Sequence, residues 1–567
     1  MDTGNVYLYI DCREGSVSPP VQGLESRRFD TVNERKAEFA TSRAGADGSF
    51  TAVMNDLGDY DPEMIVERIR SGGKVCSDYD SLVSMARATV DDFLCVTDSW
   101  GIQNHYWFMD DDVFICSNNL LLVARAIEAD LSKTAFFEYL FFLSPLGERT
   151  WFDNIRTLRP GQSLVYDRVS RKLETGPYFD PVDELFDRDP SSRTIEEASD
   201  AFFSRAVNVL SGRRAALLLS AGSDSRTVLS ALRKSGLPIT AYSFGTPDLR
   251  ATVEIEALVS MLGLDWDLVD ISPLAGGWEE RFRSSCLLTS GYLNPLRVHY
   301  DLLYERIPRE HAVFEGIFGS QSIKGEFCEG STVGRCYAEV IRRGNTVEGA
   351  VKKHCPGISP DLAGRMVEYI SDTYGRDMID TDTGAGMRNF YSLAFSMVPG
   401  RIFSGMMLLG ASEHDTYYPF LSFDLLRSVY SRGLGARRSL SIRSDFPGPV
   451  AALVPESIIV RSMDREIYRS VLDRGVSFRE ALEYPMKLSE AIRKARNLIR
   501  KIRFRGYFAG QVDNTAIHVK MASYIRRARS VHPLIDGIAD EPGLSKQAAN
   551  TGMILEIVEG SRPPDRL

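Results

Sequence analysis

Residues 220–225, Ser-Ala-Gly-Ser-Asp-Ser, have the composition of a loop that binds phosphate. Their small side chains let backbone N–H groups approach an anion, and the helix expected from residue 226 adds unpaired donors and a dipole. The hydroxyls of Ser220 and Ser225 can donate hydrogen bonds to phosphate oxygens. Asp224 fits beside a phosphate only if a cation lies between them, which suggests Mg²⁺ with a di- or triphosphate.

Two features of this turn have more than one interpretation. The simpler interpretation of the turn is a helix N-cap, in which a serine or aspartate side chain accepts hydrogen bonds from free amides. Arg226 either contacts phosphate or pairs with a neighbouring acid. The turn is not a Walker loop, because the Gly-Lys-Ser ending is missing.

Apolar strands and helices alternate around the turn. The sequence predicts strands at residues 215–220, 239–244 and 266–271, and helices at 226–235 and 252–262. This β-α-β-α-β order predicts a parallel sheet that helices cover on both faces. Ligands of such sheets bind at the carboxyl ends of the strands, so the position of the turn favours ligand binding.

The first half of the chain has a different pattern, rich in short strands. The predicted strands are residues 6–10, 93–97, 106–109, 113–116 and 163–166, and the predicted helices are 120–129 and 133–142. Residues 180–192 are polar and include two prolines, which favours an inter-domain linker over a long surface loop. We therefore expect domains at residues 1–185 and 193–475 and a helical, basic extension at 476–567.

Composition excludes several classes of protein. The chain has 567 residues and a net charge of −10, which argues against a dedicated nucleic-acid-binding protein. Its eight cysteines are scattered and predict reduced thiols, and the dispersed histidines give no zinc pattern. No signal peptide and no transmembrane segment is evident, so we expect a cytoplasmic protein.

The motifs, in this order along the chain, resemble those of the asparagine synthetase family. Residues 220–225 are similar to its Ser-Gly-Gly-x-Asp-Ser pyrophosphate loop, and residues 242–245, Tyr-Ser-Phe-Gly, to its second nucleotide-contacting strand. Segments 315–321 and 415–421 resemble two further motifs of the synthetase half. Segments 97–101 and 148–161 resemble motifs of the glutaminase half.

The resemblance implies a fold and a set of site residues. It implies an N-terminal α-β-β-α glutaminase-like (Ntn-type) domain and a C-terminal adenine-nucleotide α-hydrolase-like parallel sheet. It implies ATP and Mg²⁺ as cofactors, with Asp224 as the metal ligand, and Asp224 and Arg226 as catalytic residues. The implied nucleotide-binding residues are Leu219, Ser220, Gly222, Ser223, Ser225, Ser243, Phe244, Gly245, Glu315 and Gly316.

The chain departs from the family pattern at chemically important positions. The glutaminase of the family needs an N-terminal Cys, but here Asp2 follows Met1, and Cys12 would require loss of the strand expected at residues 6–10. Ser320 stands at the position of the second magnesium-binding Asp, and Met463 at that of a family Lys. Nearby Lys324, Arg461 or Arg465 could supply charge from a shifted position.

Two functions follow from this pattern. In the first, the protein is an ATP-dependent ligase that adenylates a small-molecule or peptide carboxylate and forms an amide with an amine or ammonia, without glutaminase activity. In the second, it is a catalytically degenerate, nucleotide-binding relative that acts as a scaffold. The retained Asp224 favours the first, and Ser320 and Met463 favour the second.

Residues 486–505 predict one long helix with a basic face. The apolar stripe of this helix (Leu488, Ile492, Ala495, Ile499, Ile502) is expected to pack against the body of the protein and leave the basic face in solvent. The alternative is that the basic face contacts an acidic partner. A homodimer is the assembly we consider for the chain.

Overall fold

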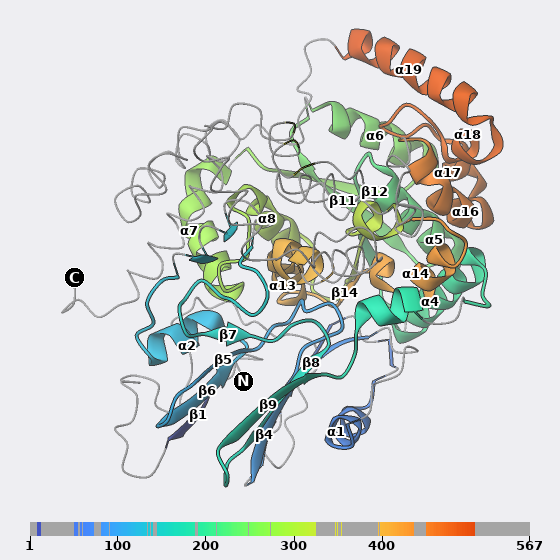
Figure 1. Cartoon of the computed structure of the whole chain (residues 1–567). Helices are drawn as coiled ribbons and strands as arrows, with labels where there is room; N and C mark the ends of the chain where they lie inside the picture. Colours follow the sequence, from blue (N-terminus) through green and yellow to red (C-terminus); the bar gives the residue numbers. More distant parts are fainter. Residues whose placement is uncertain are drawn as a thin grey trace.

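The computed structural model describes residues 8–12, 50–54, 57–58, 60–72, 81–89, 91–132, 134–135, 138–139, 144–187, 191–210, 212–247, 249–272, 274–324, 346, 349, 353, 395, 397–435 and 449–504. The protein is a mixed α/β protein, with antiparallel sheets in its first half and a parallel sheet in its second half (Figure 1). The predicted helix at 133–142 lies only partly within these residues, and the part of the extension beyond residue 504 lies outside them.

The first half contains two antiparallel sheets. One has the order β1-β6-β5-β7, with bounds Leu8–Cys12, Val113–Ser117, Tyr106–Met109 and Arg156–Thr157. The other has the order β2-β3-β4-β8-β9, with bounds Phe50–Met54, Leu82–Ala88, Asp92–Val96, Gln162–Asp167 and Lys172–Pro177.

The two sheets face each other, and a helix covers each outer face. Alternate residues of β4 point to opposite faces, so that Phe93 packs with Phe114 of β6 between the sheets, while Leu94 faces outward. Helix α1 (Pro62–Arg70) packs on that outward face, and α2 (Leu120–Ala126) packs on the outer face of the other sheet. The result is the expected α-β-β-α order of layers (Figure 1).

The second half is built on one parallel sheet. Its order is β12-β11-β10-β13-β14, with bounds Asp265–Asp270, Ile239–Gly245, Ala215–Leu218, Ala312–Glu315 and Thr416–Tyr417. From β10 the chain passes to β11 and β12 on one side, and then returns to β13 on the other side. The point where the strand order reverses therefore lies between β10 and β13, which is where open α/β sheets bind ligands.

Helices cover both faces of this sheet, as the apolar strands predict. One face is covered by α4 (Ile195–Leu210), α5 (Ser223–Ser235), α6 (Arg250–Leu262), α14 (Phe423–Tyr430) and α16 (Val454–Met463). The other is covered by α7 (Leu274–Leu288), α8 (His299–Arg306) and α13 (Ser404–Ala411). Helices α5 and α6 end at Gly236 and Gly263, both in the left-handed conformation.

Shorter helical segments complete the described chain. The π-helical turns are Asp183–Asp187, Gly319–Ile323 and Val398–Phe403. The 3-10 turns are Pro295–Arg297, Pro419–Leu421 and Ala451–Leu453. The last α-helices are α17 (Arg465–Arg469), α18 (Phe478–Glu483) and α19 (Met486–Arg503). None of the described helices is both long and apolar enough to cross a membrane.

The two halves are packed against each other. Trp100 of the first half stacks on Phe423, with ring centroids 4.8 Å apart, and its Nε1 donates to the carbonyl of Leu421 at 3.0 Å. The segment expected to be a polar linker is largely packed as well, since Leu185 is buried and Phe186 stacks on Tyr430. The halves are thus joined by a core rather than by an exposed linker over residues 180–187.

Helix α19 has the opposite orientation to the one expected. Its apolar residues Leu488, Ile499 and Ile502 are 48%, 62% and 70% exposed. Part of the basic face turns inward instead, because Arg496 pairs with Glu480 of α18 at 2.6 Å and Arg500 pairs with Glu254 of α6. The lysines of the helix, Lys487, Lys494 and Lys501, stay exposed. The prediction of a packed Leu–Ile stripe is therefore wrong, and the arginines attach this helix to the body along α18 and α6 (Figure 1).

Candidate functional site

Residues 220–225 lead from the end of β10 into the first turn of α5, which begins at Ser223, at the reversal point of the parallel sheet. The N-cap residue of α5 is Gly222, whose backbone is extended and which has no side chain to accept from the first amides. The interpretation of the turn as a side-chain N-cap is therefore not the arrangement seen. The first turn of α5 keeps the features of an anion-binding helix start.

Two serines connect the loop to the helix. The backbone N–H of Ser220 donates to the Oγ of Ser225 at 3.0 Å, and the two hydroxyl oxygens are also 3.0 Å apart. The N–H of Gly222 lies 3.3 Å from the Oγ of Ser220. Ser225 is buried while Ser220 is exposed, so one serine holds the loop and the other is open to a ligand.

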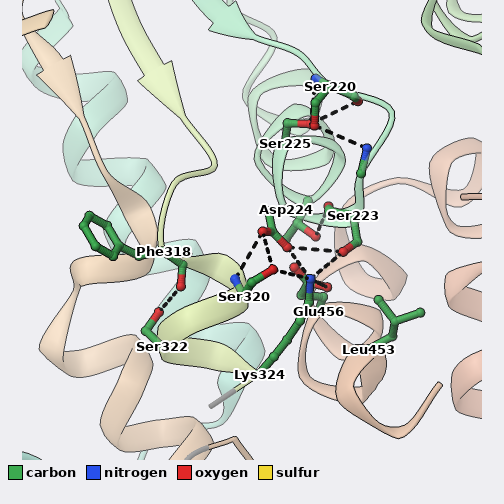
Figure 2. A network of polar contacts seen from close by, with 12 residues as sticks. Ser220, Ser223, Asp224, Ser225, Phe318, Ser320, Ser322, Lys324, Leu453 and Glu456 are labelled. Carbon is green, nitrogen blue, oxygen red and sulfur yellow. Dashed lines mark hydrogen bonds and ion pairs between the residues drawn. The ribbon is translucent and has the colours of Figure 1, made fainter. Parts of the chain in front are cut away.

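Asp224 lies at the centre of a polar network that joins three segments (Figure 2). Its Oδ2 accepts from both the backbone N–H and the hydroxyl of Ser320, at 3.1 and 3.0 Å. Its Oδ1 pairs with the ammonium of Lys324. The same ammonium donates to the hydroxyl of Ser223 at 2.8 Å. Glu456 of α16 lies on the far side, with its Oε2 3.5 Å from the Nζ of Lys324.

Burial and charge determine the protonation of this cluster. Burial would raise the pKa of Asp224, but the charge of Lys324 and the hydrogen bonds from Lys324 and Ser320 hold that pKa at about 2. Burial would lower the pKa of Lys324, but Asp224 and Glu456 raise it above its usual 10.5. Burial raises the pKa of Glu456 well above 4.5, and Lys324 offsets only part of that effect. Asp224 and Lys324 thus form an ionised pair at neutral pH, beside a glutamate whose pKa burial raises.

Two glycines let these segments approach closely. A Cβ on Gly316 would lie 2.6 Å from the backbone nitrogen of Ser225. A Cβ on Gly319 would lie 2.6 Å from the Cγ of Asp224. Both distances are shorter than real Cβ contacts allow, so the segment after β13 reaches α5 only because these side chains are missing. The sequence identified Gly316 but not Gly319.

The predicted nucleotide-binding residues on β11 and β13 lie outside the polar network around Asp224. The hydroxyl of Ser243 donates to the carbonyl of Leu219 at 2.7 Å, and thereby ties β11 to the start of the loop. Phe244, before Gly245, packs on His299 with ring centroids 4.1 Å apart. The carboxyl of Glu315 is buried against the hydroxyl of Tyr304, and burial raises its pKa to about 7. Ser243 thus holds the strand beside the loop, whereas Phe244 and Glu315 pack against α8.

Arg226 and Met463 lie away from the face of the loop. Arg226 is buried, and its Nη1 donates to the carbonyl of Val471 at 2.9 Å, which is a contact within the fold. Its predicted catalytic role stays a prediction. Met463, the position of the family Lys, lines a surface hollow together with Lys234. Lys234 is eleven residues along α5 from Ser223, roughly 16 Å at 1.5 Å per residue. A lysine at residue 463 would point to the wrong end of the helix.

The cluster does not fit the predicted Mg²⁺ ion. Magnesium needs close to six oxygen ligands at about 2.0–2.1 Å in octahedral geometry. Here the Oδ2 of Asp224 accepts from Ser320, and the ammonium of Lys324 stands between Asp224 and Glu456. Within the described part of the chain, no three His, Cys, Asp or Glu residues are grouped around a common point, and the two carboxyl groups here already flank an ammonium.

Comparisons with known proteins add little to this geometry. No family model matches the sequence, and no curated protein matches it. Glutamine phosphoribosylpyrophosphate amidotransferase from B. subtilis, complexed with ADP and GMP, is similar over 40% of this chain and 47% of its own, with 11% identity and a TM-score of 0.15. A structure of the allosteric regulatory enzyme of purine biosynthesis is similar over 40% and 46%, with 8% identity and a TM-score of 0.14.

Each match spans about half of the neighbour's length. TM-scores this low carry no argument about activity. The description of the fold therefore rests on the strand orders and layers given above, and the function is argued from the site.

Proposed function

We propose that residues 220–225 bind the phosphate groups of ATP, and that the protein uses ATP to activate a carboxylate for amide formation. The observation that carries the first part is the start of α5, whose N-cap is Gly222 and which lies at the reversal point of the parallel sheet. Helix amides at such a point attract anions through hydrogen bonds and the helix dipole. The exposed Ser220 adds a hydroxyl on the same loop.

The charge of the cluster beneath the loop supports anion binding. An ionised Asp224 alone would repel phosphate. Its pairing with Lys324 offsets that repulsion, and the raised pKa of Glu456 disfavours a second negative charge there. The loop amides can then act on a ligand without opposition from the carboxylate immediately below them.

The reaction class is supported by the order of the motifs, which resembles the asparagine synthetase family. In that reaction a carboxylate oxygen attacks the α-phosphorus of ATP and pyrophosphate leaves. An amine or ammonia then attacks the acyl carbon, and AMP leaves with the bonding electrons. This chain would contribute loop amides that hold the phosphate charge and orient the two reactants.

We also propose that the first half does not hydrolyse glutamine. Cys12 is the last residue of β1, and residues Leu8 to Asp11 pair with Ser117 to Phe114 of β6. To become an N-terminal nucleophile, Cys12 would have to lose the whole preceding part of that strand. Release of glutamate from glutamine by the purified protein, but not by a Cys12→Ala variant, would refute this proposal.

A second function, nucleotide binding without turnover, is favoured by one observation. Both oxygens of Asp224 already have partners, Ser320 and Lys324, where the family pattern predicts a metal. Exchange of labelled pyrophosphate into ATP, tested with a panel of carboxylic acids, separates the two functions. Exchange with any acid supports the ligase, whereas ATP binding without exchange supports the binding protein.

Gly222→Ala tests the loop itself. The backbone of Gly222 has φ −76°, and an added Cβ would meet only the Oγ of Ser220, at an ordinary 3.4 Å. The fold should therefore tolerate the methyl group, while a phosphate is kept from the amides. We expect ATP affinity to fall at least about tenfold, equivalent to roughly 1.4 kcal/mol, by isothermal titration calorimetry.

Gly176→Ala is the matched control for this variant. Gly176 lies on β9 at the edge of its sheet, with nothing within 4 Å of an added Cβ. This variant should bind ATP as the parent does. Equal ATP affinity of the Gly222→Ala variant and the parent would show that residues 220–225 do not bind the phosphates.

A further inference from the structure

The geometry points to Lys324 as a built-in replacement for a divalent cation, so that this loop binds its polyphosphate ligand without Mg²⁺. This inference rests on the proposed nucleotide binding and concerns how that same site handles charge. It is carried by the position of one ammonium group among the acids and hydroxyls of three separate segments (Figure 2).

The ammonium stands where a cation that serves this loop would be expected. It pairs with Asp224, lies 3.5 Å from the Oε2 of Glu456, and donates to the hydroxyl of Ser223 at 2.8 Å. The hydroxyl of Ser320 is 3.3 Å away. Two carboxyl groups and two hydroxyls thus surround one positive charge. Lys324 is only 2% exposed, so this charge belongs to the fold rather than to the surface.

The backbone is shaped to place the lysine there. Lys324 follows the π-helical turn Gly319–Ile323, and such turns are rare and often occur at functional sites. Phe318, just before the turn, has the left-handed φ of 71° that non-glycine residues seldom adopt. The absent side chain of Gly319 lets the turn touch Asp224. These three features bring Ser320 and Lys324 against the same carboxylate.

A magnesium ion and this ammonium exclude each other. A metal bound to Asp224 would lie within a few ångströms of the Nζ of Lys324, where two positive charges repel strongly in a buried site. The second oxygen of Asp224 is already used by the N–H and hydroxyl of Ser320. A single fixed charge on Lys324 instead neutralises Asp224 permanently, and the loop amides are left free to contact the phosphate.

The experiment compares metal-free and metal-loaded binding. ATP and inorganic tripolyphosphate are titrated into the full-length protein by calorimetry, once in excess EDTA and once in excess Mg²⁺. The parent should bind in EDTA at least as tightly as in Mg²⁺. Binding that requires Mg²⁺ overturns this inference and leaves the proposed nucleotide binding intact. The absence of binding in both conditions overturns the proposed function and this inference with it.

A double variant provides the reverse test. Ser320→Asp with Lys324→Met removes the ammonium and adds an acid beside Asp224 and Glu456, which makes an oxygen-rich site of the kind that Mg²⁺ prefers. In EDTA we expect its affinity for ATP to fall at least tenfold relative to the parent, since the carboxylates beneath the loop are no longer neutralised and repel phosphate. Mg²⁺ should then restore it. Metal-independent binding by this variant would also contradict the inference.

A fold control keeps this test interpretable. Asp224→Asn with Lys324→Met removes both charges of the pair together, which buried pairs usually tolerate. Circular dichroism and the thermal midpoint of each variant are measured before titration. If the inference holds, this folded and neutral variant binds ATP equally with and without Mg²⁺. A Mg²⁺ requirement in this variant would show that the metal acts elsewhere than at Lys324.

Discussion

Asp98 in the first half and Asp224 in the second half are both aspartates in a turn after a strand, yet they are held in opposite ways. Asp98 accepts from the backbone N–H groups of Trp100 and Gln103, at 2.9 and 2.7 Å. Burial dominates these bonds and raises its pKa to about 6. Asp224 is held by an ammonium and a serine, and its pKa falls to about 2. Asp98 thus holds the backbone of its turn through hydrogen bonds, whereas Asp224 is kept ionised by its neighbours.

The surroundings of the two turns agree with this distinction. The Asp98 turn places Trp100 against Leu421 and Phe423, and the carbonyl of Gly101 lies close to Gly400. It therefore fastens one half of the molecule to the other. The Asp224 turn lies beside the exposed Ser220. Asp224 and its partner Lys324 are therefore near enough to the exposed part of the loop to affect ligand binding, whereas Asp98 is not. Variants of the two turns should then differ in ATP binding as well as in stability.

The largest effect is expected from Lys324→Met. This variant leaves the carboxylate of Asp224 in a largely enclosed site without its counter-charge. Removing one partner of a buried ion pair costs about 4 kcal/mol of unfolding free energy, measured by urea denaturation. In the Asp224→Asn, Lys324→Met double variant most of that loss should be recovered. Equal losses in the single and double variants would mean that the pair does not stabilise the cluster.

Asparagine variants should change the pH dependence of stability in opposite directions. For Asp98 the folded protein holds the proton more tightly than the unfolded chain, because the pKa rises from 3.8 to about 6. Stability is therefore lost as pH rises from about 4 to 6. Asp98→Asn removes that loss, so its unfolding free energy should gain up to about 3 kcal/mol relative to the parent between pH 4 and 7.

Asp224→Asn should do the reverse. Folding lowers the pKa of Asp224 from 3.8 to about 2, so the parent gains stability as pH rises through that window. The variant lacks this gain, so its unfolding free energy relative to that of the parent should fall by about 2 kcal/mol as pH rises from 2 to 4. Differences from the parent are compared, since His105, whose pKa burial lowers to about 4, titrates in all of these proteins. If the unfolding free energies of both variants, relative to the parent, changed with pH in the same direction, the two aspartates would not be held in opposite ways.

Local signals explain why the sequence predicted the frame of the site well. The helix predicted at residues 226–235 is α5, which begins three residues earlier, at Ser223, and ends before Gly236 as expected. The strands β10 and β11 were predicted from continuous apolar runs. Such signals depend on residues a few positions apart, so one sequence is enough to read them.

The chemistry of the site depends on contacts that no local pattern records. Lys324 lies 100 residues from Asp224 in the sequence, and Glu456 comes from α16. The sequence suggested Lys324 only as a nearby charge, and it did not predict a role for Glu456. The same limit explains the reversed α19, whose arginines meet Glu254 and Glu480 from distant parts of the chain. These long-range ion pairs, and not burial of the apolar stripe, determine which face of α19 turns toward the body of the protein.

Alanine in place of two closely approached glycines should separate fold from function. A Cβ on Gly400 would lie 2.5 Å from the carbonyl oxygen of Gly101, and one on Gly319 would lie 2.6 Å from the Cγ of Asp224. Each substitution should cost about 2 kcal/mol of stability, the usual cost of overpacking. Only Gly319→Ala should weaken ATP binding, because only it displaces Asp224. A loss of ATP affinity in both variants would mean that the site depends on general packing.

The smallest effect is expected from the serines that brace the two turns. Ser225→Ala removes the acceptor for the N–H of Ser220, and Ser84→Ala removes a hydroxyl that donates to the carbonyl of Val96, two residues before Asp98. Each should cost about 1 kcal/mol of unfolding free energy, as for one buried hydrogen bond. Ser225→Ala should also weaken ATP binding severalfold, since the loop that presents Ser220 loses its support. Ser84→Ala should leave ATP affinity unchanged, and a drop equal to that of Ser225→Ala would place the effect in the fold and not in the loop.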